Sequence, residues 1–439
     1  MIKLGDFNKA LEELKNDKNN AVSFIFEKKE AQEGNLKNAV FTIKDVFATE
    51  DAKTQASSRI LSDFQPSYNA TVVQKLLNNG AVAVAKVHND ELALGGEGIY
   101  SYWGNIANPL DLTRKVGGSS SGSAATLTDN ISFALGSDTG DSVRLPASFV
   151  GKVGFKPSYG AVSRYGMFAY SSSLDTVSWF AHNVFDVSEV AKAVFGKDSK
   201  DLTSVDVEIN NVQKTKPKKV AFFDIKGKEL LDPEVEKRYF EVIELFKKEG
   251  VEVVMIEPDS HLLNSVKPVY DIVSYSEASS NLSNLNGISF GKREEGETWD
   301  QIMTNTRSKG FGKMVQRRLI LGSFFLEKEN QEELFLRAQK IRRLIKNYLD
   351  KIHSEHDLLI FPASPTVAPV FDDKTSHGFM NFILTSSNLA GNPSLTMKIG
   401  QSQKEKLPFN ITLDSKIYSD QKLLSFALWV EELLKELDK

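Results

Sequence analysis

Residues 115–125 read Lys-Val-Gly-Gly-Ser-Ser-Ser-Gly-Ser-Ala-Ala, and residues 133–146 read Phe-Ala-Leu-Gly-Ser-Asp-Thr-Gly-Asp-Ser-Val-Arg-Leu-Pro. Each stretch holds a cluster of glycine and hydroxyl residues, at 117–123 in the first and at 137–142 in the second. Glycine lets the backbone turn sharply and approach a ligand closely. Successive free N–H groups in such turns bind anions. Serines beside these turns therefore predict a nucleophile next to an oxyanion-binding site.

Two other interpretations of the clusters fit the sequence less well. A flexible Gly/Ser linker does not usually contain an apolar strand such as 131–135 or an Arg-Leu-Pro exit such as 144–146. A phosphate-binding loop has glycines at the spacing of Gly117 and Gly122, but it requires lysine where this chain has Ser123. The phosphate-loop interpretation therefore fails.

A third interpretation is a different serine nucleophile. Residues 118–122 match the G-x-S-x-G nucleophile elbow, with Ser120 as the nucleophile. That elbow follows a buried strand, and residues 108–115 do not have the pattern of one. Ser120 is therefore the alternative nucleophile that a substitution has to exclude.

The two clusters together resemble the signature of the amidase signature family, whose members hydrolyse amides with a Ser–Ser–Lys triad. The resemblance is carried by Gly-Gly-Ser-Ser-Ser-Gly-Ser at 117–123 and by Gly-Ser-Asp-Thr-Gly-Asp-Ser-Val-Arg-Leu-Pro-Ala-Ser at 136–148. The family's lysine lies upstream at the end of a strand, in a motif like the Ile-Lys-Asp of residues 43–45. The fold that this resemblance implies is α/β, with a large mixed β-sheet core wrapped by helices.

Matched residue by residue, the resemblance implies Ser142 as the nucleophile, Ser119 as the bridging serine and Lys44 as the base. A serine hydroxyl attacks poorly until a base removes its proton. Lysine is such a base only when burial or a nearby cation lowers its pKa. In the family the bridging serine follows a cis peptide bond, which here is the bond before Ser119. The implied oxyanion hole consists of the backbone N–H groups of Thr139, Gly140, Asp141 and Ser142.

Asp141 departs from the family pattern, which usually has glycine immediately before the nucleophile. If that glycine has a positive φ, aspartate adopts the same conformation at some cost. A carboxylate beside an oxyanion site also opposes the negative charge that forms there. The spacing between Ser119 and Ser142, 142 − 119 = 23 residues, is one shorter than expected of the family.

Four further stretches narrow the resemblance to the A subunits of glutamyl-tRNA(Gln) amidotransferases: residues 162–166, 276–282, 306–312 and 315–322. Such subunits hydrolyse glutamine and pass ammonia to the B subunit, which amidates mischarged Glu-tRNA(Gln), while a small C subunit commonly stabilises the pair. The resemblance thus implies glutamine as substrate, the B and C subunits as partners, and contact with Glu-tRNA(Gln) mainly through the partner. It implies no cofactor in this chain, with ATP and Mg expected on the partner.

The same resemblance implies three substrate-binding residues. Arg318 matches an arginine that grips the glutamine carboxylate, for which a planar guanidinium is suited. Tyr270 maps near a tyrosine of the pocket, and Asn381 stands where the family has an aspartate that holds the substrate ammonium. The family's Leu-Pro-x-Gly-x-Gln motif is only partly kept at 407–412, which read Leu-Pro-Phe-Asn-Ile-Thr. These departures and Asp141 suggest an alternative function: a subunit with weakened catalysis whose role is assembly of the complex. A second alternative is an amidase that acts on a different small amide.

The composition is that of a globular protein, with 41% hydrophobic and 26% charged residues. No apolar run is long enough to span a bilayer, and the N-terminus lacks a signal core, so we predict a cytoplasmic protein with no membrane contact. Zero cysteines exclude disulfides and a cysteine nucleophile. With 54 Lys and Arg against 58 Asp and Glu, the net charge of −4 does not attract nucleic acid. His353 and His356 lack a Glu-x-x-His pattern, and we predict no metal site.

Apolar periodicity predicts a strand–helix–strand unit in each half of the chain, typical of a mixed or parallel α/β sheet. We predict a single domain over 1–439, within which a subdomain can form at about 215–350, after the basic, proline-interrupted segment 214–219. The strands are expected at 39–43, 81–87, 131–135, 220–225, 251–256 and 358–361, and the helices at 6–15, 69–77, 233–248, 332–353 and 419–437.

Overall fold

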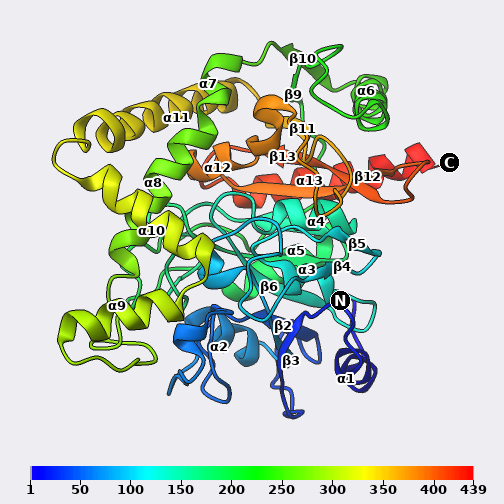
Figure 1. Ribbon diagram of the computed structural model, residues 1–439. Helices are drawn as coiled ribbons and strands as arrows, with labels where there is room; N and C mark the ends of the chain where they lie inside the picture. Colours follow the sequence, from blue (N-terminus) through cyan, green and yellow to red (C-terminus); the bar gives the residue numbers. More distant parts are fainter. Residues whose placement is uncertain (1, 439) are drawn as a thin grey trace.

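The computed structural model describes residues 2–438 and is built around one large mixed sheet (Figure 1). The eleven strands follow the order β1-β3-β2-β6-β8-β7-β12-β13-β11-β9-β10. Strands β2, β3 and β6 are parallel, whereas β7, β8, β12 and β13 pair antiparallel. The mixed α/β sheet that the sequence predicted is therefore confirmed. The strands are β1 Val22–Ile25, β2 Val40–Lys44, β3 Val82–Val87, β6 Phe133–Asp138, β7 Val153–Lys156, β8 Thr176–Ala181, β9 Lys219–Phe223, β10 Glu252–Ile256, β11 Leu358–Pro362, β12 Ser394–Gln401 and β13 Pro408–Asp414.

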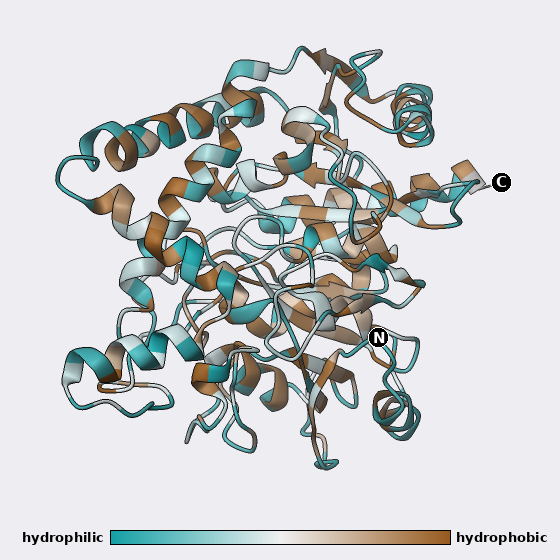
Figure 2. Cartoon of the chain, in the orientation of Figure 1, coloured by the Kyte–Doolittle hydropathy of each residue, from teal (hydrophilic) through white to brown (hydrophobic). Residues whose placement is uncertain are grey.

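The central strands are buried along their whole length because helices and loops cover both faces of the sheet. Every residue of β2, β6, β8, β11 and β13 is buried. This burial explains why the strands read as nearly continuous apolar runs instead of alternating ones. Figure 2 shows hydrophobic residues on the central strands and a mixture of hydrophobic and hydrophilic residues on the peripheral helices.

Thirteen α-helices within residues 2–438 surround the sheet. Helices α8, α10, α11 and α12 pack on one another and form a layer at one side of the molecule (Figure 1). The helices are α1 Phe7–Lys15, α2 Thr71–Asn78, α3 Ser121–Ala125, α4 Arg144–Val150, α5 Val184–Val194, α6 Pro233–Lys248, α7 Ser260–Asn264, α8 Val266–Asn281, α9 Trp299–Gly310, α10 Lys313–Leu326, α11 Arg337–Glu355, α12 Thr385–Ala390 and α13 Asp420–Leu434. No helix in this part of the chain is long and apolar enough to cross a membrane.

The second strand–helix–strand unit, β9-α6-β10, joins the same sheet as the first. Strand β9 pairs parallel with both β10 and β11. In Figure 1 this unit lies at the top of the molecule and strands β1 to β3 lie at the bottom. The two units are thus linked through the sheet, and a subdomain at about 215–350 stays a prediction.

The position of the serine clusters follows from the parallel pairing of β2 with β6. Parallel strands end at the same edge of a sheet, so Lys44 at the end of β2 lies beside the loop that follows β6. Residues 139–143 form that loop and lead into α4. Residues 116–120 cross the same edge before α3 begins.

Candidate active site

Lys44 is fully buried at the end of β2, where it faces three serine hydroxyls. Its Nζ atom lies 2.8 Å from Ser119 Oγ and 2.9 Å from both Ser120 Oγ and Ser137 Oγ. Burial lowers the pKa of Lys44 to about 7, and the more distant Asp90, Asp138 and Asp175 oppose that change. A substantial fraction of Lys44 is therefore neutral near neutral pH and able to accept a proton.

The peptide bond between Gly118 and Ser119 is cis, as the resemblance implied. Asp90 holds this segment, because its backbone N–H donates to the Ser119 carbonyl at 3.2 Å. The Asp90 carboxylate accepts from the N–H groups of the following loop, at 2.7 Å from Gly96 N and 2.9 Å from Tyr100 N. Only glycine fits at position 118, since a Cβ there would lie 2.1 Å from Asp90 Oδ2.

Ser142 lies at the turn between β6 and α4 and is 5% exposed. Its carbonyl accepts from the N–H of Ser120 at 3.1 Å, which fixes the two serine clusters against each other. Its hydroxyl has no hydrogen-bond partner anywhere in residues 2–438, Ser119 included. The structure therefore brings Lys44 and Ser119 into contact and leaves the Ser142 hydroxyl free.

Ser120, the alternative nucleophile, has different surroundings. Its side chain is fully buried, donates to the Ser137 carbonyl at 3.0 Å and accepts from the Ser137 N–H at 3.2 Å. The preceding strand, β5 Asp111–Lys115, belongs to a separate two-stranded hairpin with β4 Ala107–Asn108 and is partly exposed. A nucleophile elbow needs an accessible hydroxyl after a buried strand, and neither condition is met.

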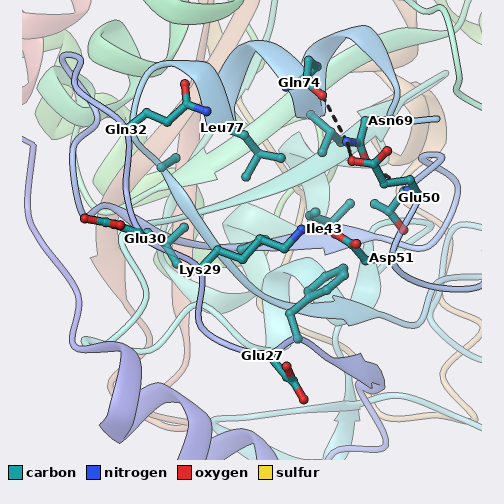
Figure 3. Close-up of a pocket in the computed structure, with 16 residues that line it drawn as sticks. Glu27, Lys29, Glu30, Gln32, Ile43, Glu50, Asp51, Asn69, Gln74 and Leu77 are labelled. Carbon is teal, nitrogen blue, oxygen red and sulfur yellow. Dashed lines mark hydrogen bonds and ion pairs between the residues drawn. The ribbon is translucent and has the colours of Figure 1, made fainter.

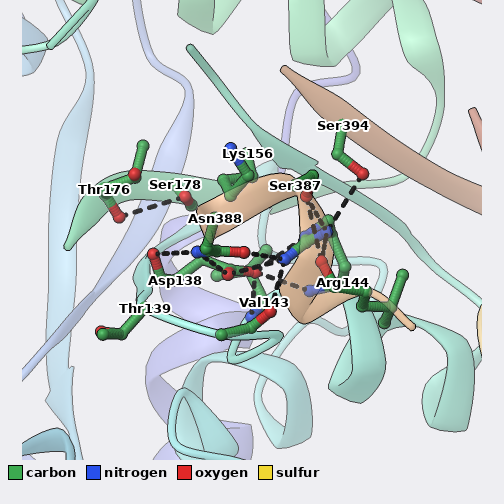
Figure 4. A network of polar contacts seen from close by, with 12 residues as sticks. Asp138, Thr139, Val143, Arg144, Lys156, Thr176, Ser178, Ser387, Asn388 and Ser394 are labelled. Carbon is green, nitrogen blue, oxygen red and sulfur yellow. Dashed lines mark hydrogen bonds and ion pairs between the residues drawn. The ribbon is translucent and has the colours of Figure 1, made fainter. Parts of the chain in front are cut away.

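A buried ion pair behind the loop holds it in place (Figure 4). Arg144 Nη2 lies 2.9 Å from Asp138 Oδ1 and donates to the Gly140 carbonyl at 2.8 Å. The N–H of Val143 donates to Asp138 Oδ2 at 3.0 Å, and Arg144 also reaches Asn388 Oδ1 at 2.6 Å. The Arg-Leu-Pro sequence at 144–146 does not by itself predict that Arg144 holds the loop. The loop that carries Ser142 is thereby fixed from both ends.

The three predicted substrate-binding residues line one pocket of about 330 Å³ together with the loop before Ser142. Tyr270 comes from α8, Arg318 from α10 and Asn381 from the turn η4 Gly378–Phe382. Gly140 faces Tyr270 so closely that a Cβ would lie 3.1 Å from its Cζ atom. A side chain at position 140 would therefore push the Tyr270 ring back by a few tenths of an ångström.

Arg318 is 8% exposed and is held by neighbours that leave part of its guanidinium unused. Nη1 donates to Tyr170 Oη at 3.0 Å and Nη2 donates to the Gly95 carbonyl at 3.3 Å. The guanidinium also lies 5.0 Å from the centre of the Tyr275 ring. Its Nε has no partner in residues 2–438. A permanently charged fork with an unused donor is suited to a carboxylate ligand.

Asp141 occupies a position where the family usually has glycine, but its φ is not positive. Burial, and next the charge of Asp138, raise the pKa of Asp141 to about 7, while Arg144 and Arg318 act in the opposite direction. The carboxyl group is therefore partly protonated near neutral pH. This weakens the conflict with an oxyanion that the sequence suggested.

A second pocket, of about 200 Å³, lies between β2, β3 and α2 (Figure 3). Its floor contains Ile43 and Leu77, and its rim contains Glu50 and an ion pair between Lys29 and Asp51. None of its lining residues is a serine or a histidine, its threonine hydroxyl, Thr49, donates to the Ala52 carbonyl at 3.3 Å, and its Lys29 is paired with Asp51. Within residues 2–438 no group of three or more His, Cys, Asp or Glu side chains is placed to hold a metal ion.

Comparisons with known proteins show the family of this chain. The family model "Amidase" matches residues 7–424. The A subunit of glutamyl-tRNA(Gln) amidotransferase from Pelagibacter ubique is 36% identical over 416 residues, which cover 91% of this chain and 84% of that protein. The protein of the same name from Legionella pneumophila is 39% identical over 396 residues, which cover 88% and 81%. The crystal structure of the A subunit of glutamyl-tRNA(Gln) amidotransferase from Thermotoga maritima matches with a TM-score of 0.81 and 31% identity, covering 97% of this chain and 90% of that one.

Proposed function

Because the chain belongs to the amidase family, we propose that it is the glutamine-hydrolysing A subunit of a glutamyl-tRNA(Gln) amidotransferase. The observation that carries the proposal is the contact of buried Lys44 with Ser119, beside the pocket that holds Arg318, Tyr270 and Asn381. The relatives of that name, which resemble this chain over most of both lengths, support the same substrate. An amide-hydrolysing enzyme is the common element of all these findings.

In the proposed reaction Ser142 attacks the side-chain amide carbon of glutamine. The Ser142 proton passes to Ser119 Oγ as the Ser119 proton passes to neutral Lys44. The carbonyl oxygen gains negative charge in the tetrahedral intermediate and faces the backbone N–H groups of residues 139–142. Lys44 then returns a proton through Ser119 to the leaving nitrogen, the C–N bond breaks, and ammonia departs. Water hydrolyses the Ser142 ester by the same proton path and releases glutamate.

The proposed substrate orientation follows from the pocket. The α-carboxylate of glutamine binds the guanidinium of Arg318, and the side-chain amide extends toward Ser142. Tyr270 packs on the chain of methylene groups beside Gly140. Asn381 lines the same pocket and offers an amide oxygen in place of the expected carboxylate.

The proposed partners are the B and C subunits of the amidotransferase, with Glu-tRNA(Gln) bound mainly through the partner. ATP and Mg are expected on that partner, and this chain is proposed to need no cofactor. Ammonia protonates and escapes in water, so the complex needs a sealed path from Ser142 to the second site. A specific interface of this kind buries more than about 1,000 Å². We propose a cytoplasmic location for the assembly.

The proposal is tested by measuring ammonia release from L-glutamine by the chain alone and after assembly with the B and C subunits. We expect glutamine-dependent formation of Gln-tRNA(Gln) by the assembly, and its loss on substitution of Ser142. A stable complex that amidates Glu-tRNA(Gln) with ammonium chloride but not with glutamine would instead identify a protein kept for assembly, with weakened catalysis. Turnover of other small amides in the absence of glutamine turnover would identify a different amidase.

The assembly alternative has one structural observation in its favour. The Ser142 hydroxyl makes no hydrogen bond with Ser119 in residues 2–438, so the proton path is not closed without substrate. Catalytic hydrogen bonds often form only in the substrate complex, so an open path in the free chain is also compatible with catalysis. The ammonium chloride experiment separates the two cases.

A further inference from the structure

Four carboxylate side chains line the pocket of Arg318, and three of them have partners. Glu97 pairs with Lys115 at 3.0 Å, and Asp271 pairs with Lys267. Asp373 is exposed and accepts from the backbone N–H of Thr375 at 2.9 Å. The fourth carboxylate, Asp141, has neither a hydrogen bond nor an ion pair through its side chain in residues 2–438.

Asp141 is only partly buried, so its carboxyl group is open to a ligand in the pocket that supplies a hydrogen-bond donor. The charged groups nearest to Asp141 do not satisfy it. Asp138 and Asp90 repel its ionised form, and Arg144 is already engaged by Asp138 and Asn388. Arg318 attracts Asp141 but forms no ion pair with it, and both side chains line the pocket.

A pocket lined by both groups is suited to the backbone end of an amino acid. The ammonium and carboxylate of glutamine share one carbon atom, so their binding groups have to converge without neutralising each other. Arg318 and Asp141 line the same pocket without forming an ion pair, and above a pH of about 7 Asp141 carries the negative charge that an ammonium group requires. Asn381 lines the pocket too, but its amide lacks the charge of the aspartate that the family has there.

We propose that Asp141 binds the α-ammonium group of the substrate and is the residue that makes the pocket specific for a free amino acid. The inference rests on the proposed glutaminase function. The two departures from the family pattern, Asn381 and Asp141, then form one exchange: the carboxylate absent at position 381 is supplied from position 141. Both positions line one pocket, which is the arrangement that such an exchange requires.

The test compares two substrates in the assembled complex: L-glutamine and glutaramate, which is glutamine without the ammonium group. Ammonia release gives kcat/KM for each substrate. The ratio of the two values is independent of the amount of folded enzyme, because both substrates use the same preparation. The variants are Asp141→Asn and Asp141→Gly, and Asp300→Asn on the exposed face of α9 is the matched control.

We expect the wild-type complex to prefer glutamine over glutaramate by about tenfold or more, the worth of one hydrogen bond to a charged group. Both Asp141 variants should lose most of this preference through a higher KM for glutamine, with Asp300→Asn unchanged. A preference that persists in both Asp141 variants overturns the inference and leaves the glutaminase function standing. A wild-type complex that releases no ammonia from glutamine overturns the proposed function itself.

Discussion

The Nζ atom of Lys44 lies 2.8 Å from the Oγ atom of Ser119, although 75 residues separate them in the chain. The contact exists because β2 ends beside the segment that follows the cis bond at Gly118. Within residues 2–438 no carboxylate contacts Lys44 directly, and its three closest partners are serine hydroxyls. A lysine in such surroundings is not held in its charged form by an ion pair, which is the condition for a lysine base.

Lys44→Met should lower glutamine hydrolysis by about 10²-fold or more, the usual contribution of a general base. In the wild type, kcat/KM should rise with pH through about 7, because the active form of Lys44 is the deprotonated one. The residual activity of the variant should lack this rise. Lys53→Met, at an exposed position, is the control. A variant that keeps the wild-type pH profile would exclude Lys44 as the base.

Lys44→Met should also change the pH dependence of stability. The pKa of Lys44 is about 7 in the folded protein and about 10.5 in the unfolded chain, so the unfolded state binds more protons between these values. The free energy of unfolding of the wild type should therefore gain up to about 2–3 kcal/mol from Lys44 between pH 7 and pH 9. Urea titrations of both proteins at the two pH values measure the difference. Equal slopes in wild type and variant would show that burial does not perturb Lys44.

Ser142→Ala should affect turnover, whereas Ser120→Ala should affect stability. Ser142→Ala should abolish turnover at unchanged stability, since its hydroxyl makes no hydrogen bond in residues 2–438. Ser120→Ala should cost about 1–3 kcal/mol of stability, because its buried hydroxyl is bonded to the backbone of Ser137. Activity and thermal unfolding of both variants decide the assignment. An active Ser142→Ala protein would return the nucleophile to Ser120.

The parts of this site that could be predicted are those with a local sequence signal. The glycine and serine clusters carried the family resemblance, and that resemblance selected Ser119, Ser142 and Lys44, two of which the structure brings into contact. The structure places Arg318 and Asn381 in one pocket, as the resemblance implied, although more than 60 residues separate them.

The parts that could not be predicted depend on contacts between distant segments. Asp90 carries no motif, and its role is visible only once the loop from Gly96 to Tyr100 folds over its carboxylate. Asn388 belongs to a motif whose only predicted use was to align Asn381 with the family's aspartate. In the structure its side chain accepts a hydrogen bond from Arg144. Hydrogen-bond partners of this kind follow from the fold and leave no spacing pattern in the chain.

Glu91→Gln tests a buried carboxylate that links the segment after Asp90 to the start of α10. Glu91 accepts from Ser58 Oγ at 2.5 Å and from Gly312 N, at the start of α10, at 2.8 Å. Burial raises the pKa of Glu91 to about 7, against the effect of these two hydrogen bonds. A carboxyl whose folded pKa lies above its unfolded value stabilises the protein at low pH and loses that effect as pH rises through the folded pKa.

The wild type should therefore lose up to about 3 kcal/mol of stability relative to Glu91→Gln between pH 4.5 and pH 8. Denaturant unfolding of the two proteins across this range measures the difference. The exposed Glu295→Gln variant should follow the wild type at every pH. A stability difference that does not vary with pH would show that Glu91 stays ionised in the folded protein.

Arg318→Lys tests how the pocket reads the substrate carboxylate. The guanidinium donates to Tyr170 and Gly95 at once and keeps a donor unused, which an ammonium group on a flexible stem cannot reproduce. We expect KM for glutamine to rise about tenfold or more with a smaller change in kcat, while Arg317→Lys, the exposed neighbour on α10, stays at the wild-type value. Glutaramate keeps the carboxylate, so its KM should rise by the same factor, in contrast to the selective loss expected at Asp141. An Arg318→Lys enzyme with unchanged KM for both substrates would show that the carboxylate binds elsewhere in the pocket.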